Sequence, residues 1–499
     1  MIFGSSQKIK RAAVFAASII AAASILTVDS MSFISYAETA TDLQTAAEER
    51  KSLPIQSNEI ENWPDGPEVS SEAAIVMDIN TGVILYAKNI HEQLYPASTT
   101  KIMTCLLAAE NSALSDTVTF SYEAVHSLPS GASNIGMDEG QSITMEEALY
   151  GILVGSANEV ANAVAEHVSG SIDDFVDLMN EKAAELGCTD THFANTNGLH
   201  EDDHYTSVYD MALIASEFFS NELLSRISNT PRYHFVATDT QPDDFYISNT
   251  HAIVTGEYTY SGLVGGKTGY TNEARRTLVT CAERDGMKLV CIVFKNEAPS
   301  QYTDTITLLD YGFNNFQAVN VADNDETYIP DDSAFFQSSS DIFGDSSAIL
   351  EFNEDDHIII PTTATMEDVD TSISYDVTGL DNDRAIAVVS YTYNGQYVGS
   401  ATIQTVATLS NSSTEWSSTA GTDSENVEAE SFSTNNVIYI NVRYIVWILL
   451  SVAFLISMIA IVHSALIHNH IIHSKEERRR MRKRKRESKK FKLNIDNYK

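Results

Sequence analysis

A segment of 24 residues, Tyr444–Ile467, contains no Asp, Glu, Lys or Arg. Roughly 20 apolar residues span the hydrocarbon core of a bilayer as a helix, so we predict a transmembrane helix here. Residues 475–499 carry 13 Lys/Arg against 4 Asp/Glu. Because positive charge stays on the cytoplasmic side, we expect the tail 468–499 inside the cell and the N-terminal body outside. Such a tail beside a membrane helix is expected to contact anionic lipid.

The N-terminus has the three parts of a secretory signal peptide. Basic residues between positions 8 and 11 precede the apolar stretch Ala12–Val28, and small residues near Ala37 suit cleavage. We expect residues 1–37 to be removed, and an uncleaved membrane anchor is the alternative. The protein would then reach its outer location by secretion.

The charge of the body excludes one class of partner. The whole chain carries −38 and residues 475–499 carry +9, which leaves −47 for residues 1–474. An acidic body does not bind nucleic acid non-specifically, because phosphate binding needs a basic surface. Four cysteines are too few for a disulfide scaffold, although a bridge between Cys281 and Cys291, across a hairpin turn predicted at Asp285-Gly286, stays open.

Composition and periodicity divide the chain into segments. Short strands around Asn394-Gly395, a strong hairpin signal, indicate a small β domain, and the Ser/Thr-rich stretch after it indicates a flexible stalk. The predicted boundaries are a signal peptide (1–37), a polar spacer (38–70), a catalytic domain (71–315), a β domain (316–406), a stalk (407–436), a membrane-proximal segment (437–443), a transmembrane helix (444–467) and a basic cytoplasmic tail (468–499).

A possible nucleophile and base lie one helical turn apart. Ser98 and Lys101 begin a predicted helix, and a spacing of three places both on one face. Serine needs a base to take its proton, and a lysine serves if burial and a second cation lower its pKa. Alone the pattern is weak, because an N-cap serine followed by a solvated lysine is common.

Two further polar motifs follow along the chain. Ser156 and Asn158 come after an apolar run, at a predicted helix end, and could relay a proton or orient Lys101. Lys267-Thr268-Gly269 then reads as an edge strand, where small residues let a substrate backbone pair as an added strand. The set Ser-x-x-Lys, Ser-x-Asn and Lys-Thr-Gly occurs in β-lactamases and penicillin-binding proteins.

The order and spacing of these motifs resemble the low-molecular-weight penicillin-binding proteins, specifically the serine D-alanyl-D-alanine carboxypeptidases. Supporting segments are Tyr95–Thr104, Asn195–Leu199, His204–Thr206 and Leu308–Phe313. The resemblance covers about residues 70–406. It implies an α/β catalytic domain, with an antiparallel sheet, helices against one face and a mostly helical subdomain, followed by the small β domain. It also implies covalent binding of penicillin and no metal or organic cofactor.

The resemblance also implies a role for each motif residue. Ser98 would be acylated, Lys101 would be the base, and Ser156 and Asn158 would assist proton transfer and positioning. The substrate-binding residues would be Lys267, Thr268, Gly269 and Tyr270, with Lys267 and Thr268 facing the terminal carboxylate. The backbone N–H groups of Ser98 and Tyr270 would form the oxyanion hole.

The sequence departs from the family pattern at the carboxylate site. The family usually carries an arginine at the start of its closing helix, where this chain has Gln301. Downstream of Lys-Thr-Gly, Arg275 follows Ala274 where the family usually has glycine, and Arg276 comes next. One of these arginines could replace the missing charge, but we expect both to face solvent.

The resemblance predicts an enzyme that removes the terminal D-Ala from peptidoglycan pentapeptide stems through an acyl-enzyme, with β-lactams as inhibitors. It would act in cell wall biogenesis and cell shape, as a single-pass membrane protein with its catalytic domain outside a bacterial cell. The alternatives are a DD-endopeptidase, a β-lactamase, and a wall-binding or sensory penicillin-binding protein that turns over poorly.

Overall fold

The computed structural model describes residues 44–325, 327, 350–380 and 382–405. The predictions for the signal peptide, the stalk, the membrane-proximal segment, the transmembrane helix and the basic tail fall outside these residues. Within the described ranges, no helix is both long and apolar enough to cross a bilayer.

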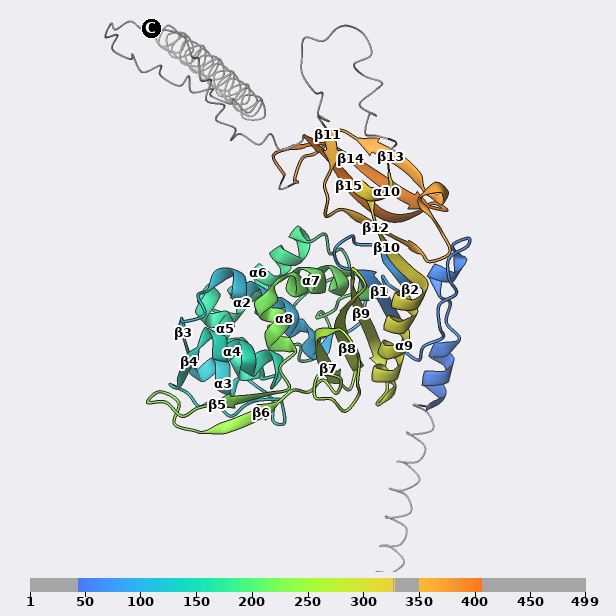
Figure 1. Ribbon diagram of the computed structural model, residues 1–499. Coiled ribbons are helices and arrows are strands. Elements are labelled where there is room, and N and C mark those ends of the chain that lie inside the picture. Colours follow the sequence, from blue (N-terminus) through green and yellow to red (C-terminus); the bar gives the residue numbers. More distant parts are fainter. Residues whose placement is uncertain (1–43, 326, 328–349, 381, 406–499) are drawn as a thin grey trace, which may run out of the picture. The chain divides into compact units, whose positions relative to one another are not determined.

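A five-stranded antiparallel sheet in the order β2-β1-β9-β8-β7 forms the centre of the larger domain (Figure 1). Its strands are β1 (Ala73–Asp78), β2 (Ile84–Lys88), β7 (Leu263–Thr271), β8 (Arg275–Arg284) and β9 (Met287–Asn296). The turn between β8 and β9 has φ of 52° at Asp285 and 80° at Gly286, the left-handed pair of a two-residue hairpin. The hairpin predicted at Asp285-Gly286 is therefore confirmed.

The sheet is buried on both faces. Along β9, Val290 and Ile292 belong to one apolar core, and Cys291 and Val293, which point the other way, belong to the second. The first core is formed with α2 (Lys101–Asn111), α4 (Met145–Leu153), α5 (Asn158–Ser169), α6 (Ile172–Glu185), α7 (Val208–Ser220) and α8 (Glu222–Ser228). The second is covered by α9 (Ser300–Asn315). The predicted antiparallel sheet with helices and a mostly helical subdomain is therefore present, and because the sheet is apolar on both faces, helices cover both.

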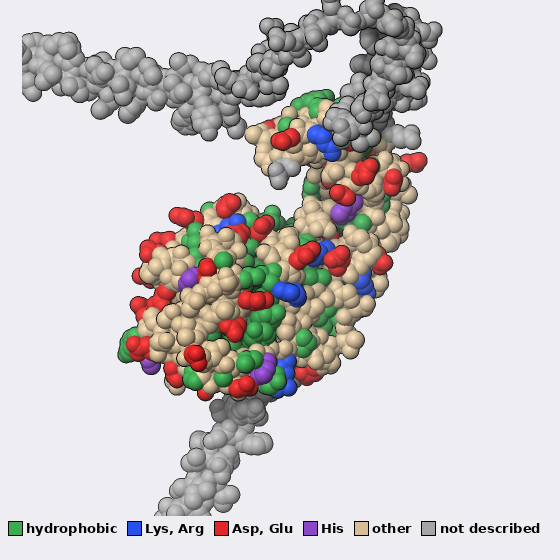
Figure 2. Space-filling view, turned by 60° about the vertical axis from the view of Figure 1, so that its left-hand side comes forward, with side chains coloured by type: hydrophobic (Ala, Val, Ile, Leu, Met, Phe, Trp, Pro, Cys, Tyr) green, Lys and Arg blue, Asp and Glu red, His purple; other side chains and the backbone are tan. Residues whose placement is uncertain are grey.

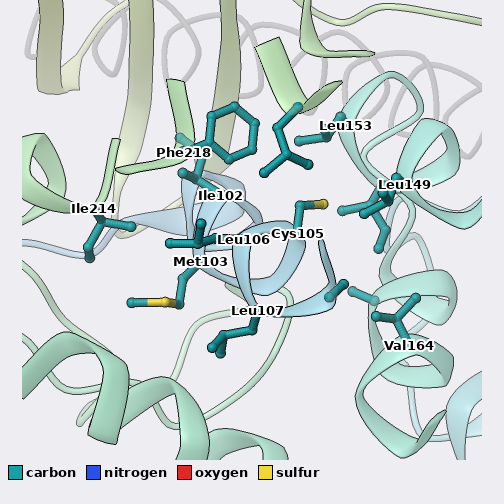
Figure 3. Close-up of a cluster of buried hydrophobic side chains, with 14 of the residues drawn as sticks. Ile102, Met103, Cys105, Leu106, Leu107, Leu149, Leu153, Val164, Ile214 and Phe218 are labelled. Carbon is teal, nitrogen blue, oxygen red and sulfur yellow. The ribbon is translucent and has the colours of Figure 1, made fainter. Parts of the chain in front are cut away.

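Helix α2 runs through the middle of the first core. Figure 3 shows its side chains meeting Leu149 and Leu153 of α4, Val164 of α5, and Ile214 and Phe218 of α7. A helix that is apolar around most of its circumference is stable only when buried. This packing fixes the start of α2, where Lys101 lies, against the surrounding helices.

Shorter elements complete the larger domain. They are the 3-10 turns η1 (Gln56–Glu59) and η2 (Ala97–Thr100), the helix α3 (Tyr122–His126), the strand pair β3 (Thr117–Thr119) with β4 (Ser142–Thr144), and the hairpin β5 (Arg232–Phe235) with β6 (Phe245–Ser248).

The residues after α9 form mostly strands. β10 (Phe316–Asn320) pairs with β12 (His357–Pro361), and a four-stranded sheet has the order β11-β15-β14-β13. The remaining elements are α10 (Val321–Asn324), β11 (Leu350–Phe352), η3 (Met366–Asp368), β13 (Asp370–Ser374), β14 (Ala385–Tyr393) and β15 (Gln396–Thr405). The hairpin predicted at Asn394-Gly395 is confirmed, with φ of 49° and 79° at its two turn residues.

The four cysteines are free thiols. Cys281 pairs with Val290 in the sheet and faces the first core, whereas Cys291 pairs with Thr280 and faces the second. Side chains on opposite faces of a sheet cannot form a disulfide without moving the backbone. The Cys281–Cys291 bridge that the sequence left open is therefore excluded.

Part of the predicted polar spacer 38–70 is packed rather than solvated. A helix covers 44–51, and Trp63 is only 5% exposed. The Trp63 indole donates a hydrogen bond to the carbonyl of Leu85 at 2.9 Å, and its ring centroid lies 4.9 Å from that of Phe316. Trp63 therefore ties this segment to both β2 and β10.

Acidic side chains are scattered over the face shown in Figure 2, and Lys and Arg are few there. This distribution agrees with the excess of Asp and Glu in the body of the chain. Like charges spread over a surface keep a protein soluble but do not identify a partner.

Replacing Trp63 by alanine should lower the free energy of unfolding by about 3–5 kcal/mol, because a large buried aromatic side chain and its hydrogen bond are both lost. Urea unfolding of the protein measures the change. The control is Tyr122→Ala, which removes a ring that is 67% exposed and should change stability by less than about 0.5 kcal/mol. Equal stability of the Trp63→Ala and Tyr122→Ala proteins would show that the 55–70 segment does not contribute to the fold.

Candidate active site

Ser98 lies in the 3-10 turn η2, directly before α2. The preceding residue, Ala97, has φ of +49°, a left-handed conformation that is unusual for a residue with a side chain. Such strained positions persist only where surrounding structure imposes them, and they cluster at functional sites. Here Gly198 packs against the turn, and a Cβ on Gly198 would lie 1.8 Å from the carbonyl oxygen of Ala97.

The Lys101 amine is fully buried beside the Ser98 hydroxyl. Its Nζ lies 3.2 Å from Ser98 Oγ, and it donates hydrogen bonds to Asn158 Oδ1 at 2.6 Å and to the carbonyl of Asn197 at 2.5 Å. Burial, followed by the positive charge of Lys267, holds the pKa of Lys101 well below its usual range. A neutral amine has two N–H groups for the two carbonyl oxygens, which leaves its lone pair for the Ser98 hydroxyl.

Lys267 is the second buried amine of the site. Its Nζ donates to Ser156 Oγ at 3.0 Å and to the carbonyl of Thr268 at 2.8 Å. Burial lowers the pKa of Lys267 to about 7. Ser156 lies between α4 and α5 with φ of +56°, so this turn is strained as well. Ser156 and Asn158 thus present their side chains to two different lysines, Lys267 and Lys101.

Strand β7 forms the open edge of the five-stranded sheet, as the sequence predicts. A Cβ on Gly269 would lie 2.2 Å from Thr277 Oγ1 and 2.9 Å from the backbone nitrogen of Ser98. Only glycine therefore lets the strand approach the nucleophile turn this closely. Tyr270, the next residue, is 45% exposed.

A pocket of about 400 Å³ opens at these residues. The predicted residues that line it are Ser98, Ser156, Asn158, Thr268, Gly269 and Tyr270. Lys101 and Lys267 are not in the lining; they contact its side chains from the protein interior. The structure therefore brings all eight predicted site residues together.

Several pocket residues carry no signal that sequence reasoning could use. They are Gly131, Ala132 and Ser133 from a loop, Thr250 after β6, Thr271 and Thr277 from β7 and β8, and Tyr302 from α9. Thr250 and Thr268 share a hydrogen bond of 2.6 Å between their hydroxyl groups. The carbonyl of Asn197, which holds Lys101, lies in a segment that the family resemblance had marked.

The two arginines after β7 behave differently from the expectation that both face solvent. Arg275 makes a two-point ion pair with Glu297, at 2.9 and 2.6 Å. Arg276 lines the pocket, and its guanidinium carbon lies 4.5 Å from the centroid of the Tyr270 ring. The expectation is therefore wrong, because a carboxylate holds Arg275 and an aromatic ring at the pocket mouth holds Arg276.

Gln301 also lines the pocket and is 5% exposed. Its Oε1 is buried without a hydrogen-bond partner among the described residues. A buried amide oxygen without a partner is unfavourable, so this position is suited to a ligand or water that supplies a donor. Gln301 therefore places a neutral side chain in the pocket, at the position where the family usually carries an arginine.

The D-alanyl-D-alanine carboxypeptidase family, peptidase S11, matches this chain over residues 60–298. D-alanyl-D-alanine carboxypeptidase DacF of Bacillus subtilis is 36% identical over 253 residues, which are 50% of this chain and 63% of DacF. DacB2 of Mycobacterium tuberculosis, also named a D-alanyl-D-alanine carboxypeptidase, is 32% identical over 256 residues, which are 50% of this chain and 84% of DacB2. The match therefore spans less than two thirds of DacF and most of DacB2.

A solved structure shows the same fold over more of the chain. Penicillin binding protein 5 from Haemophilus influenzae superposes with a TM-score of 0.54 and 23% identity, covering 68% of this chain and 98% of that one. The family match includes the three motifs that meet at the pocket. By sequence and by fold, the chain belongs to the serine D-alanyl-D-alanine carboxypeptidases of the low-molecular-weight penicillin-binding protein family.

Proposed function

We propose that this protein removes the terminal D-Ala from peptidoglycan pentapeptide stems and that β-lactams acylate the same serine. The observation that carries the proposal is the contact between the buried amine of Lys101 and the Ser98 hydroxyl at the edge of the pocket. Nucleophile, base and orienting groups lie within hydrogen-bonding reach, as an activated serine requires.

The first half of the reaction follows from this geometry. Lys101, neutral because it is buried, takes the proton of Ser98 as Oγ attacks the carbonyl carbon of the D-Ala-D-Ala amide. The negative charge on the carbonyl oxygen is held by the backbone N–H groups of Ser98 and Tyr270. As the C–N bond breaks, Ser156, which accepts a hydrogen bond from Lys267, gives its proton to the leaving amine and takes up the proton that Lys101 had accepted from Ser98. D-Ala departs, and Lys101 is neutral again.

The second half releases the enzyme. A water molecule attacks the ester carbon on Ser98 and gives its proton to Lys101. The ester bond then breaks, Ser98 Oγ takes that proton back from Lys101, and the shortened stem leaves as an acid that ionises in water to a new carboxylate. Asn158 keeps Lys101 oriented in both halves through its hydrogen bond of 2.6 Å. No step in this scheme requires a metal or an organic cofactor.

The location of the enzyme is part of the same proposal. A catalytic domain outside the cell, held by a helix at 444–467 and a basic tail that contacts anionic lipid, would act within reach of the wall. The apolar stretch and the tail charge in the sequence support this arrangement. The substrate is then an external polymer, in keeping with an acidic, solvated surface.

Ser98→Ala should abolish both release of D-Ala from a pentapeptide stem and covalent labelling by a fluorescent penicillin. Only the hydroxyl group is lost, so the melting temperature should stay close to that of the wild type. Ser112→Ala, at the other end of α2, is the matched control and should label normally. Labelling of a folded Ser98→Ala protein would refute the assignment. Labelling of the wild type without D-Ala release would favour a binding protein with poor turnover, and cleavage of cross-linked stems alone would favour an endopeptidase.

Lys267→Ala should move the acid limb of the pH–rate profile for acylation to higher pH. Lys101 acts as a base only when neutral, so the rate rises as pH passes upward through its pKa. Removing the nearby charge of Lys267 raises the pKa of Lys101, so less of it is neutral at a given pH. Lys101→Arg should lose acylation at every accessible pH, because a guanidinium stays protonated. An unshifted acid limb in Lys267→Ala would show that the two amines are not coupled; Lys295→Ala is the control.

Arg276 is the pocket cation that we assign to the substrate's free carboxylate. It lines the pocket beside Thr268, and among the described residues no carboxylate forms an ion pair with it, whereas Arg275 is committed to Glu297. Lys267 is buried and already donates to Ser156, so it contributes charge from further inside. Arg276 on strand β8 thus supplies the positive charge that is missing at Gln301 on α9.

Arg276→Ala should raise KM for the peptide by on the order of ten- to hundredfold, the value of a charge-assisted hydrogen bond of about 1.5–3 kcal/mol. Labelling by penicillin should change less if this contact serves mainly peptides. Arg275→Ala is the matched control, with KM close to the wild type. Adding Gln301→Arg to Arg276→Ala should recover binding by supplying the charge from α9. A loss confined to Arg275→Ala would assign the carboxylate to that arginine instead.

A further inference from the structure

The loop 131–137 forms one wall of the pocket through Gly131, Ala132 and Ser133. It belongs to no helix or strand, so other groups must hold it in place. One anchor is a hydrogen bond of 2.9 Å from the backbone N–H of Asn158 to the carbonyl of Ser133. Another is the side chain of Ile135, which lies over Gly155 so closely that a Cβ there would be 2.7 Å away.

The third anchor is the carboxylate of Glu159, in the first turn of α5. Its Oε1 accepts hydrogen bonds from the backbone N–H of Ile135 at 2.6 Å and of Gly136 at 3.2 Å. Glu159 is only 2% exposed, and no ion pair to it occurs among the described residues. Burial raises the pKa of its carboxyl, and the N–H groups of the loop oppose that effect. The loop amides therefore compensate in part for burying this carboxylate, whose other oxygen, Oε2, is buried without a hydrogen-bond partner among the described residues.

Two adjacent residues thus connect the loop to the reacting groups. Asn158 accepts from Lys101 through its side chain and holds Ser133 through its backbone. Glu159, the next residue, holds the following stretch of the loop. If the carboxylate is removed, two backbone N–H groups lose their acceptor, and a loop with unsatisfied donors turns toward water.

We propose that Glu159 is a positioning residue whose carboxylate holds the loop 131–137 as a wall of the peptide pocket. The inference rests on the proposed peptidase function, since the wall matters only if a peptide occupies the pocket. Glu159 lies outside the pocket lining, so it acts through the loop. Releasing the loop should weaken peptide binding while leaving the Ser98 and Lys101 pair able to react.

Glu159→Met and Glu159→Gln separate the contact from the charge. Met fills a similar volume without an acceptor, whereas Gln keeps one oxygen for the two N–H groups and removes the charge. Glu159→Met should speed amide hydrogen exchange in 131–137 and raise KM for a pentapeptide stem by on the order of tenfold, the range for losing hydrogen bonds to a charged acceptor. Glu159→Gln should recover most of both. Glu166→Gln is the control, because Glu166 lies on the same helix and accepts from Ser121 instead.

Labelling of Ser98 by saturating fluorescent penicillin is measured in each variant, so loss of the chemistry itself is seen separately. Unchanged exchange and KM in Glu159→Met would overturn the inference. So would a Glu159→Gln protein as impaired as Glu159→Met with a shifted pH–rate profile, since Glu159 would then act on Lys101 through its charge. If Glu159→Met does not fold, Ile135→Ala releases the loop from its other side while Glu159 stays; faster exchange with unchanged KM would then also refute a wall function.

Discussion

Burial of the Lys101 amine is the constraint on which the rest of the site depends. An amine without water must find acceptors in the protein, and Lys101 finds Asn158 at the start of α5 and the carbonyl of Asn197 in a distant loop. These contacts tie two separate parts of the chain to the first turn of α2. They also leave one direction of the amine for the Ser98 hydroxyl, so the same burial that demands structural support lowers the pKa of Lys101 and favours the neutral amine that can act as a base.

Close backbone approach is the second requirement. The turn that carries Ser98 lies against Gly269 of β7 and against Gly198 of the segment Asn195–Leu199. A Cβ at either glycine would collide with this turn. The turn also contains Ala97 in a left-handed conformation, and the opposite side of the site contains Ser156 in another. The packing of the large cores on either side of the sheet compensates for the strained backbone at these two positions. The stability of the fold therefore maintains a site geometry that would be unfavourable in an isolated segment.

Local sequence signals succeeded where a pattern and its consequence lie within a few residues. The hairpins at Asp285-Gly286 and Asn394-Gly395 follow from residues that tolerate left-handed backbone, and the three motifs were found by their spacing. Local sequence signals failed where the interacting residue lies far away in the sequence. Nothing near Thr250 or Glu159 indicates that one lines the pocket and the other holds a loop. Arg276 looked like a surface residue because its side chain meets Tyr270 only once β7 and β8 pair.

The sequence by itself determined the residue types of the reaction and the two hairpin turns, because these depend on short-range spacing, and the family resemblance of its motifs implied the class of fold. Tertiary structure alone decided which remote groups meet. The alternation along β9 is the same whichever helices cover it, yet only the packed sheet puts Cys281 and Cys291 on opposite faces and α9 over the second core. Likewise the sequence places a lysine three residues after Ser98, but only burial among Asn158, Asn197 and Lys267 lowers the pKa of that lysine, since the pKa of an amine depends on its solvent and its neighbours.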